Sequence, residues 1–575
     1  MPLVSQTFSQ LIDFTRTTAG TYVDSTGKIV STPASRNLLT FTQQFDNAAW
    51  SKNNAAVTAN TTTAPDGTLT ADKLEETATT AVHNAGQSIT TSAVAYTWSC
   101  YVKAAERNFA LLYHTQSNSS LAVNLTTGAT GTASGTVAPT SSSVVAVGNG
   151  WWRVSMTVTA TAASNFFGVY VMNDLVNASY AGVAGSGIFI WGAQLELGAL
   201  TDYTRNVGGV FPARFDYDPV TLAPRGLLIE EQRANLLTYS AEFDNAAWTK
   251  SNATATANTI AAPDGTTTAD TLAEDTATGV HSYAQTFSAT SGTSYALSGF
   301  FKNGDGRYVQ LLFGSAGHGT TAFANFDLQA GTVGTVGATA TATITNFGNG
   351  WYRCSIVSTA TATTSSASGQ FVHITSATSA RAENYTGTSK FIYGWGAQLE
   401  ARAFATSYIP TVASQVTRAA DIAAITGPNF TPWYNQSAGT FVVSVDSYAE
   451  QAGVNAYNIL SANDGTTNNF IRPYVYATNA GETVRIAAST VAEISRGTWS
   501  QNVPFNLAAT YAANDFIVAL NGALSSADTS GAVPTANQLA LGANNGVGSY
   551  LNGHIRSIRY YPSRLSNAQI QALTA

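Results

Sequence analysis

The stretch YTWSCYVK spans Tyr96–Lys103, and a near copy, YALSGFFK, spans Tyr295–Lys302. In the first copy, large apolar residues fill the even positions from Tyr96 to Val102. More polar side chains fill most of the odd positions, ending at Lys103. Alternation with a period of two is typical of a β-strand with one buried face. Both stretches therefore predict strands. In the first, Tyr96, Trp98, Cys100 and Val102 should face a core, and in the second the matching positions should do so.

The duplication extends well beyond these strands. The hexapeptide FDNAAW occurs at Phe45–Trp50 and again at Phe243–Trp248. WGAQLE occurs at Trp191–Glu196 and at Trp395–Glu400, and GNGW occurs between them in each copy. These motifs keep their order over a length far greater than that of a solenoid unit. The chain therefore contains the same domain twice.

Short alternating segments separated by Gly, Asn and Ser turns indicate an all-β protein, and neither copy shows a helical period. The predicted organisation is two tandem jelly-roll β-sandwiches followed by a third module of different pattern. The predicted boundaries are 1–35 for an N-terminal connector, 36–207 for the first jelly roll, 208–232 for a linker or hairpin, 233–418 for the second jelly roll and 419–575 for the third module. A short helix at Ser566–Ala575, with Ser566 as its N-cap, is expected to end the chain.

Composition excludes several functions. The net charge of −7 with no basic stripe argues against nucleic acid as a partner. The sequence has no apolar run of ~18 residues, so membrane insertion is not expected. The first residues lack the pattern of a secretory signal. Cys100 and Cys354 occupy non-equivalent places in the two copies, which argues against a disulfide and fits synthesis in a reducing cytoplasm.

The motifs NLLT, FDNAAW, APDGT, GNGW and WGAQLE resemble those of carbohydrate-binding-module-like jelly rolls in tailed-bacteriophage virion proteins, of the tail-fibre or spike type. The stretches TYVDSTGKIV and ARFDYDPVTLAPRGLLIEEQRANLL are similar to segments of the same proteins. The last module resembles concanavalin-like, or laminin-G-like, lectin domains, through Asn521-Gly522 and the closing pattern around GHIRSIRYYPSRL. Together these resemblances cover nearly the whole chain.

The resemblance implies a non-enzymatic virion protein, assembled in the host cytoplasm, that binds host cell-surface glycans and contacts other virion proteins. It favours a homo-oligomer, a trimer above other orders, and virion anchoring through residues 1–35. One alternative is a purely structural capsid-decoration or connector protein. A second is a polysaccharide-degrading tail enzyme, although the sequence contains no nucleophile elbow, zinc-protease motif or phosphate-binding loop.

The predicted glycan site lies on the odd face of the duplicated strands. Sugar recognition needs an aromatic face for the pyranose ring and polar groups for its hydroxyls. The candidate residues are Tyr101, Lys103, Trp151 and Arg153 in the first copy and Phe300, Lys302, Trp351 and Arg353 in the second. Aromatic rings with two cations suit an acidic glycan. The alternative is structural: the tryptophans wedge the sheet edge, and the arginines pair with Glu196 and Glu400.

The only cofactor that the sequence suggests is a structural calcium ion. Jelly-roll carbohydrate modules with a similar opening sequence can hold calcium through an early carboxylate, which here corresponds to Asp46 and Asp244. The final strand offers Gly-Ala-Gln where such modules often have acidic ligands, and calcium requires several oxygen donors. The favoured interpretation is that Trp50 and Trp248 plug one end of each sandwich while the aspartates cap a turn.

Overall fold

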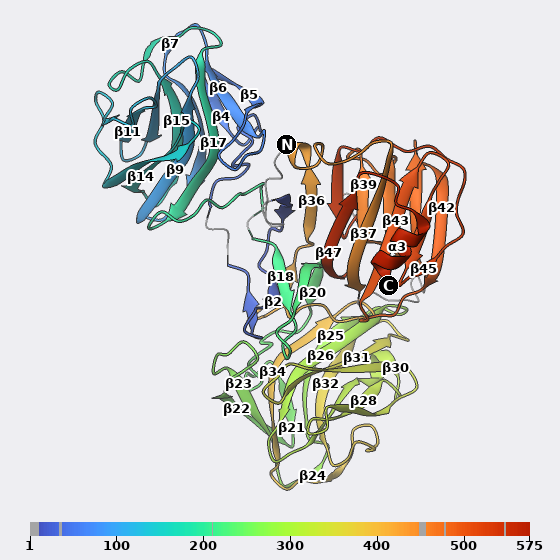
Figure 1. Ribbon diagram of the computed structural model, residues 1–575. Helices are drawn as coiled ribbons and strands as arrows, with labels where there is room; N and C mark the ends of the chain where they lie inside the picture. The colour runs from blue at the N-terminus through green and yellow to red at the C-terminus, as the bar shows by residue number, and fades with distance from the viewer. Residues whose placement is uncertain (1–10, 34–36, 210, 448–455, 477–478, 545–547) are drawn as a thin grey trace. The chain divides into compact units, whose positions relative to one another are not determined.

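The computed structural model describes residues 11–33, 37–209, 211–447, 456–476, 479–544 and 548–575. The protein is all-β, as predicted, and is built of antiparallel β-sandwiches (Figure 1). It divides into two compact units. The main segment of the first unit is Pro33–Pro212, and the second unit contains Thr18–Thr32, Ala213–Ala424 and Trp433–Ala575.

Repeat 1, in the first unit, consists of two six-stranded sheets. The strands of the first sheet, in spatial order, are β12 (Thr130–Gly131), β11 (Ser119–Asn124), β10 (Phe109–His114), β15 (Ser164–Met172), β8 (His83–Thr90) and β4 (Ser51–Asn53). Those of the second are β13 (Ser141–Gly148), β14 (Trp151–Thr159), β9 (Ala95–Ala104), β17 (Gly187–Leu197), β6 (Ala71–Glu76) and β5 (Ala55–Thr62). A two-stranded ribbon adds β7 (Thr80–Ala81) and β16 (Tyr180–Ala181).

Repeat 2 has the same two six-stranded sheets in the same order. The first contains β29 (Thr332–Val336), β28 (Phe323–Asp327), β27 (Tyr308–Phe313), β32 (Thr364–Ile374), β25 (Ser282–Ala289) and β21 (Thr249–Ser251). The second contains β30 (Ala340–Asn346), β31 (Trp351–Thr359), β26 (Ser294–Asn303), β34 (Phe391–Glu400), β23 (Ala269–Glu274) and β22 (Ala253–Ile260). The ribbon is β24 (Thr278–Gly279) with β33 (Tyr385–Thr386), and a single turn of helix, α2 (Ser315–His318), follows β27.

The predicted core faces are confirmed. Tyr96, Trp98, Cys100 and Val102 of β9 are all buried in the core between the two sheets of repeat 1. Their spacing places them on one side of a pleated strand, and their burial against the opposite sheet holds the register. The cysteine thiols are free and buried.

The repeated FDNAAW motif contributes two aromatic rings to the core of each sandwich. The rings of Phe45 and Trp50 lie 4.4 Å apart in repeat 1, and those of Phe243 and Trp248 lie 4.7 Å apart in repeat 2. All four side chains are buried. Each indole donates its N–H to a backbone carbonyl nine residues earlier in the chain, at 3.0 Å in both repeats. The tryptophans are therefore core residues of the two sandwiches.

The third module is a sandwich to which the predicted linker contributes two strands. One sheet contains β18 (Arg214–Tyr217), β19 (Pro224–Ile229), β47 (Gly553–Tyr561), β37 (Ala438–Ser447), β43 (Phe505–Ala512), β44 (Ile517–Leu520) and β45 (Ala523–Leu524). The facing sheet includes β46 (Gln538–Leu541), β39 (Leu460–Asn463), β40 (Phe470–Tyr476), β41 (Asn479–Ile486) and β42 (Ser489–Thr498), and β38 (Ala456–Asn458) also pairs with β40. The stretch expected to be a linker or hairpin is thus a hairpin that extends this sheet.

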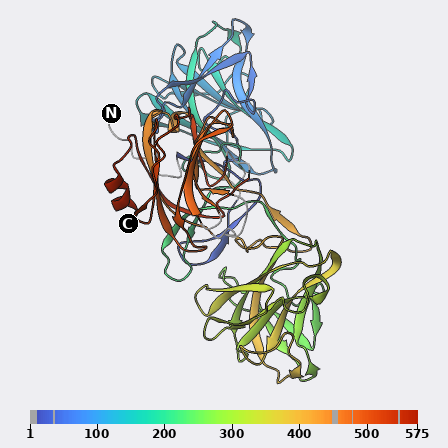
Figure 2. The same ribbon diagram turned by 90° about the vertical axis from the view of Figure 1, so that its right-hand side faces the viewer.

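The chain ends in the predicted helix. The helix α3 (Asn567–Thr574) begins at the N-cap Ser566, whose side chain accepts a hydrogen bond from the backbone of Gln569, and the Gln569 side chain returns one. This reciprocal pair satisfies two amide groups at the start of the helix. Ile570 packs on the outer face of the sheet that contains β37, and Figure 2 shows α3 on the outside of this sandwich.

The remaining elements lie in the connecting segments. They are β1 (Asp13–Thr15), β2 (Thr21–Val23), β3 (Ile29–Ser31), β20 (Arg233–Asn235), β35 (Val416–Arg418), β36 (Ile422–Thr426) and the 3-10 turn Gly427–Asn429. Strands β20 and β35 pair with each other, so the two ends of repeat 2 meet. Arg36, the predicted start of repeat 1, lies outside the described residues, as do 1–10 of the proposed anchoring segment.

Candidate functional site

The eight residues predicted to bind glycan occupy equivalent positions on the outer faces of the two repeats. In repeat 1, β14 pairs with β9 so that Arg153 lies opposite Tyr101, and Trp151 lies opposite Lys103. In repeat 2, β31 pairs with β26 so that Arg353 lies opposite Phe300 and Trp351 opposite Lys302. Each arginine lies over its aromatic partner, with 5.4 Å from the guanidinium carbon to the ring centre in both repeats.

The tryptophans on this face are buried, which corrects the prediction that they offer a stacking surface. Trp151 is 1% exposed and Trp351 is 3% exposed. The Trp151 indole donates its N–H to the Thr63 carbonyl at 3.0 Å, and that of Trp351 donates to the Ala261 carbonyl at 3.2 Å. The loop that carries the repeated Ala-Pro-Asp-Gly turn covers each ring. A sugar therefore has no access to these indole faces.

Phe300 is also buried, at 1% exposure, whereas its counterpart Tyr101 is half-buried. Two apolar residues of the β2–β3 hairpin, Val23 and Ile29, belong to the same cluster as Phe300 and Trp351. Part of the outer face of repeat 2 is therefore covered by the hairpin, and the residues there form a second small core. A strand period identifies the two faces of a sheet, but it does not show that a distant hairpin covers the outer one.

The two arginines do not form the ion pairs that the alternative interpretation proposed. Arg153 donates to the carbonyl of Thr201 at 2.8 Å, and Glu196 accepts from the backbone amide of that same threonine at 2.9 Å. In repeat 2, Arg353 donates to the carbonyl of Thr406 at 2.8 Å, and Glu400 accepts from its amide at 2.9 Å. In both repeats one threonine thus bridges the arginine and the glutamate.

The surroundings of Asp46 and Asp244 do not resemble a calcium site. Both side chains are exposed. The Lys52 ammonium group donates to the carbonyls of Asp46 and Asn47 at 2.8 and 2.6 Å, and Lys250 does the same in repeat 2. Within the described residues, no group of three or more His, Cys, Asp or Glu side chains could hold a metal ion. In each repeat, the backbone carbonyl oxygens beside the aspartate thus already accept hydrogen bonds from a lysine ammonium group.

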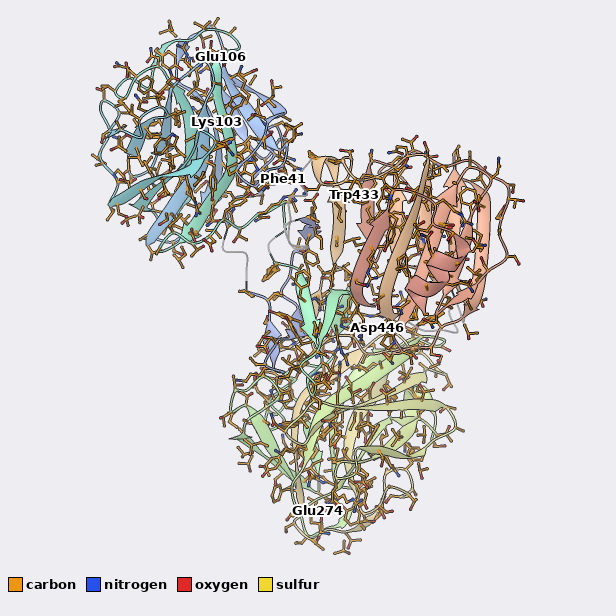
Figure 3. All side chains as sticks on the ribbon, in the orientation of Figure 1. Phe41, Lys103, Glu106, Glu274, Trp433 and Asp446 are labelled. Carbon is orange, nitrogen blue, oxygen red and sulfur yellow. The ribbon has the colours of Figure 1, made fainter. Side chains whose placement is uncertain are left out.

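A cleft of about 630 Å³ lies in the second unit, against the outer face of β30 and β31. Its walls come from repeat 2, the β2–β3 hairpin, the β18–β19 hairpin and the ends of β37 and β47. Its polar and aromatic lining includes Tyr22, Arg225, Arg353, Asp446, His554 and Arg556. Figure 3 labels Asp446 at this place. The structure therefore brings the predicted residue Arg353 together with residues far away in sequence.

A row of hydroxyl groups runs along one wall of the cleft. Thr341, Thr343 and Thr345 alternate along β30 and are exposed. Thr345 pairs with Arg353 across the strands, and Thr343 pairs with Ser355. Side chains at alternate positions of a strand project to the same face. The wall thus presents a guanidinium group beside several hydroxyl donors and acceptors.

His554 fastens the β18 strand to the C-terminal module at the bottom of the cleft. Its Nδ1 lies 2.7 Å from Asp446 Oδ1, and its Nε2 lies 2.8 Å from Asp216 Oδ2. Burial acts to lower the pKa of His554, but the two carboxylates outweigh it and raise that pKa to about 9. Burial acts to raise the pKa of Asp446, yet His554 and Arg556 bring it down to about 2. The imidazolium is therefore charged at neutral pH.

A second buried ionic cluster holds the connector to repeat 2. Arg214 pairs with Glu230 at 2.7 Å and also with Asp421. Arg418, the last residue of β35, pairs with Glu230 at 2.9 Å. All four side chains are almost fully buried. An unpaired charge in the protein interior is costly in free energy, so these side chains keep their pairing. The cluster therefore holds the connector in a fixed position beside the cleft.

The carboxylates near the cleft are all engaged with cations. Asp216 and Asp446 share His554, Glu230 pairs with Arg214, and Asp218 pairs with Arg225 at 2.9 Å. Arg353 also lines the cleft and donates to a backbone carbonyl and to the Ser298 hydroxyl. The cleft lining therefore combines arginine side chains with hydroxyl groups.

Sequence reasoning missed Asp216, Arg225, His554 and Arg556. One signal was present: Arg214 and Asp216 alternate in the segment predicted as a linker or hairpin, and His554 and Arg556 alternate near the start of GHIRSIRYYPSRL. Charged residues repeated on one face of a strand are unusual in a chain with only 10% charged residues. Nothing in the two local patterns, however, predicts that these strands share a sheet.

Comparisons with known proteins give only weak structural similarities. No protein-family model matches the chain, and no curated protein matches it. The solved structures it is similar to include the CBM40 module of the Ruminococcus gnavus IT-sialidase, at 18% identity over 26% of this chain and 88% of that one, with a TM-score of 0.23. Another is the NanB sialidase from Streptococcus pneumoniae, at 17% identity over 24% of each chain, with a TM-score of 0.22.

The binding domain of botulinum neurotoxin serotype D is a third similar structure. It matches at 13% identity over 27% of this chain and 39% of that one, with a TM-score of 0.23. Likenesses this weak carry no argument about function. Among the described residues, no helix is long and apolar enough to cross a membrane.

Proposed function

We propose that the protein is a non-enzymatic virion protein, of the tail-fibre or spike type, that binds acidic host cell-surface glycans in the cleft beside β30 and β31. The observation that carries the proposal is the lining of the cleft, where Arg353 lies next to a row of threonine hydroxyls. Hydroxyl-rich ligands with a carboxylate or sulfate match such a surface, because guanidinium binds oxyanions with two parallel hydrogen bonds.

Several parts of the proposal rest on the motifs of the sequence. These parts are the virion location, assembly in the host cytoplasm, and contact with other virion proteins. A homo-oligomer, with a trimer favoured, would present several copies of the cleft at once. Weak sites linked in this way bind a cell surface far more tightly than one site alone.

The test is a glycan array probed with the purified full chain and with two matched variants. Arg353→Ala removes a cation from the cleft, and Arg153→Ala removes its counterpart in repeat 1, where Val145 takes the place of Thr345 beside the arginine. We expect saturable binding to acidic glycans that falls about ten-fold in Arg353→Ala and is unchanged in Arg153→Ala. Circular dichroism confirms that both variants are folded.

Other outcomes would assign a different function. Equal loss in both variants would contradict the cleft as the site. Absence of glycan and cell binding, together with tight binding to another virion protein, would favour the capsid-decoration or connector alternative. Release of reducing ends from a bound polysaccharide would instead indicate the degrading tail enzyme.

A further inference from the structure

One buried glutamate occurs at the same place in both repeats, but its surroundings differ. Glu76 ends β6 in repeat 1, and Glu274 ends β23 in repeat 2. Each is buried, and each accepts a hydrogen bond from a tyrosine hydroxyl of the two-stranded ribbon, Tyr180 or Tyr385. Figure 3 labels Glu274 at the end of repeat 2 remote from Asp446, so it is separate from the proposed glycan cleft.

In repeat 1 the chain supplies its own cation to this glutamate. The Arg107 guanidinium donates to Glu76 Oε1 through Nε at 3.0 Å and also through Nη2. Burial acts to raise the pKa of Glu76, but the hydrogen bonds from Arg107 and Tyr180 outweigh it and hold that pKa below its usual value. A second ion pair joins Lys73 to Glu106 at 2.9 Å beside it.

Repeat 2 keeps both carboxylates and lacks both cations. The residue equivalent to Arg107 is Gly306: the Arg107 amide donates to the Gly187 carbonyl at 2.9 Å, and the Gly306 amide donates to the Phe391 carbonyl at 2.8 Å. Asp305 occupies the place of Glu106, and Thr271 that of Lys73. Of the two cations nearby, Arg307 pairs with Asp327 and Lys390 is an exposed rim residue.

A pocket of about 180 Å³ lies in repeat 2 where repeat 1 holds the arginine side chain, and Glu274, Asp305 and His373 line it. His373 is 3% exposed, and its Nε2 has no hydrogen-bond partner among the described residues. Burial lowers the pKa of His373 to about 4, so the ring is neutral near pH 7. The equivalent residue of repeat 1 is the apolar Val171. His83 and His318 also have buried ring nitrogens without a partner among the described residues, but His373 is the one that lines this pocket beside Glu274, where its Nε2 can accept a further hydrogen bond.

We propose that this pocket binds a guanidinium group carried by a ligand, in the place that Arg107 fills in repeat 1. The planar group would donate to the Glu274 carboxylate, and its other N–H groups would reach His373 Nε2 and Asp305. Glu274 now accepts from the Thr388 amide at 2.7 Å and from its hydroxyl at 3.1 Å. The guanidinium displaces the hydroxyl bond, because a hydrogen bond to the carboxylate is stronger from a cationic donor than from a neutral hydroxyl.

Titration of methylguanidinium into the full chain, followed by calorimetry, tests the proposal. We expect one saturable site in the natural protein. Glu274→Gln should weaken binding about ten-fold or more, because it removes the charge but keeps the shape. Arg107→Gly should raise the stoichiometry from one to two, because it empties the equivalent pocket in repeat 1. Tetramethylammonium, which has equal charge but no N–H donor, should not compete.

His373→Val gives a second variant, since it restores the residue of repeat 1 and should weaken binding even if Glu274→Gln folds poorly. If an arginine-containing tripeptide binds more tightly than methylguanidinium, the guanidinium group comes from a side chain of a partner protein. If the tripeptide binds more weakly, the group comes from a free small molecule. The proposal would be overturned if the Arg107→Gly variant bound methylguanidinium and the natural chain did not. That result would show that Thr388 and Lys390 close the pocket of repeat 2.

Discussion

At the scale of single residues, Trp351 shows how a side chain with a plausible binding role is used for packing. Its ring lies in a cluster with Phe300, Trp395 and Tyr408, and its indole N–H is satisfied by the Ala261 carbonyl. A buried ring of this size contributes mainly through the apolar area that it removes from water. Trp151 plays the same part in repeat 1.

Trp351→Ala should lower the free energy of unfolding by about 3–5 kcal/mol, because it leaves a large cavity under the loop that covers the ring. Trp351→Phe should cost much less. Chemical denaturation of the full chain measures both changes. A variant that kept its stability but lost glycan binding would show that the indole contacts the ligand after all.

Glu482 is a second residue whose surroundings decide its behaviour. It is buried in β41, and neither carboxyl oxygen has a hydrogen-bond partner among the described residues. Burial raises the pKa of Glu482 well above its ordinary value of 4.5. The unfolded chain therefore releases this proton at a lower pH than the folded chain does, and stability falls as pH rises above that ordinary value.

Glu482→Gln should remove this pH dependence. At pH 8 we expect the variant to be more stable than the natural chain by about 2 kcal/mol, with little difference near pH 4. Thermal melting at the two pH values, compared between the two proteins, makes the measurement. A stability difference between the natural chain and the variant that is the same at both pH values would contradict a protonated buried Glu482.

At the scale of elements, the β18–β19 hairpin is the feature that joins repeat 2 to the last module. β19 pairs with β47, and Asp216 of β18 binds His554 of β47. The pKa of His554 is raised and that of Asp446 is lowered, so the two shifts stabilise the fold on opposite sides of the pH scale. The histidine contribution is complete below 6.5 and is lost as pH rises through about 9. The aspartate contribution is complete above 3.8 and is lost as pH falls through about 2.

His554→Gln should therefore destabilise the second unit by about 3 kcal/mol at pH 6, because it leaves Asp216 buried without a cation and Asp446 with Arg556 alone. The difference from the natural chain should shrink as pH rises above about 9. Calorimetric melting over this range is the measurement. Asp218→Asn is the control and should cost less, because it removes the half-buried ion pair with Arg225 while the asparagine oxygen can still accept from the Val220 and Thr221 amides.

At the scale of the whole molecule, the two compact units differ in how far each depends on distant segments. The large core of repeat 1 is built only from residues between Leu39 and Leu195. Repeat 2, in contrast, shares an apolar cluster with the β2–β3 hairpin, and the β18–β19 hairpin pairs with the last module. Repeat 1 is thus the more self-contained of the two copies.

A fragment of residues 37–209 should fold alone and melt cooperatively, because its core is complete. A fragment of residues 213–418 should aggregate, because β19 loses β47 and exposes an unpaired edge with Leu227, Leu228 and Ile229. Light scattering and circular dichroism of the two fragments measure this. A monomeric, folded second fragment would contradict the dependence.

The amino-acid sequence alone predicts the duplication, which is visible because the same motifs recur in the same order. It also predicts the all-β sandwiches, the core-facing positions of β9 and the capped helix that begins after Ser566, because these features depend on spacing within about ten residues, where the periods of strand and helix act directly. The tertiary structure was needed to show that Trp151 and Trp351 are covered, that His554 bridges Asp216 and Asp446, and that a pocket lies beside Glu274. Those outcomes join residues from distant parts of the chain, and no local period records which strands become neighbours.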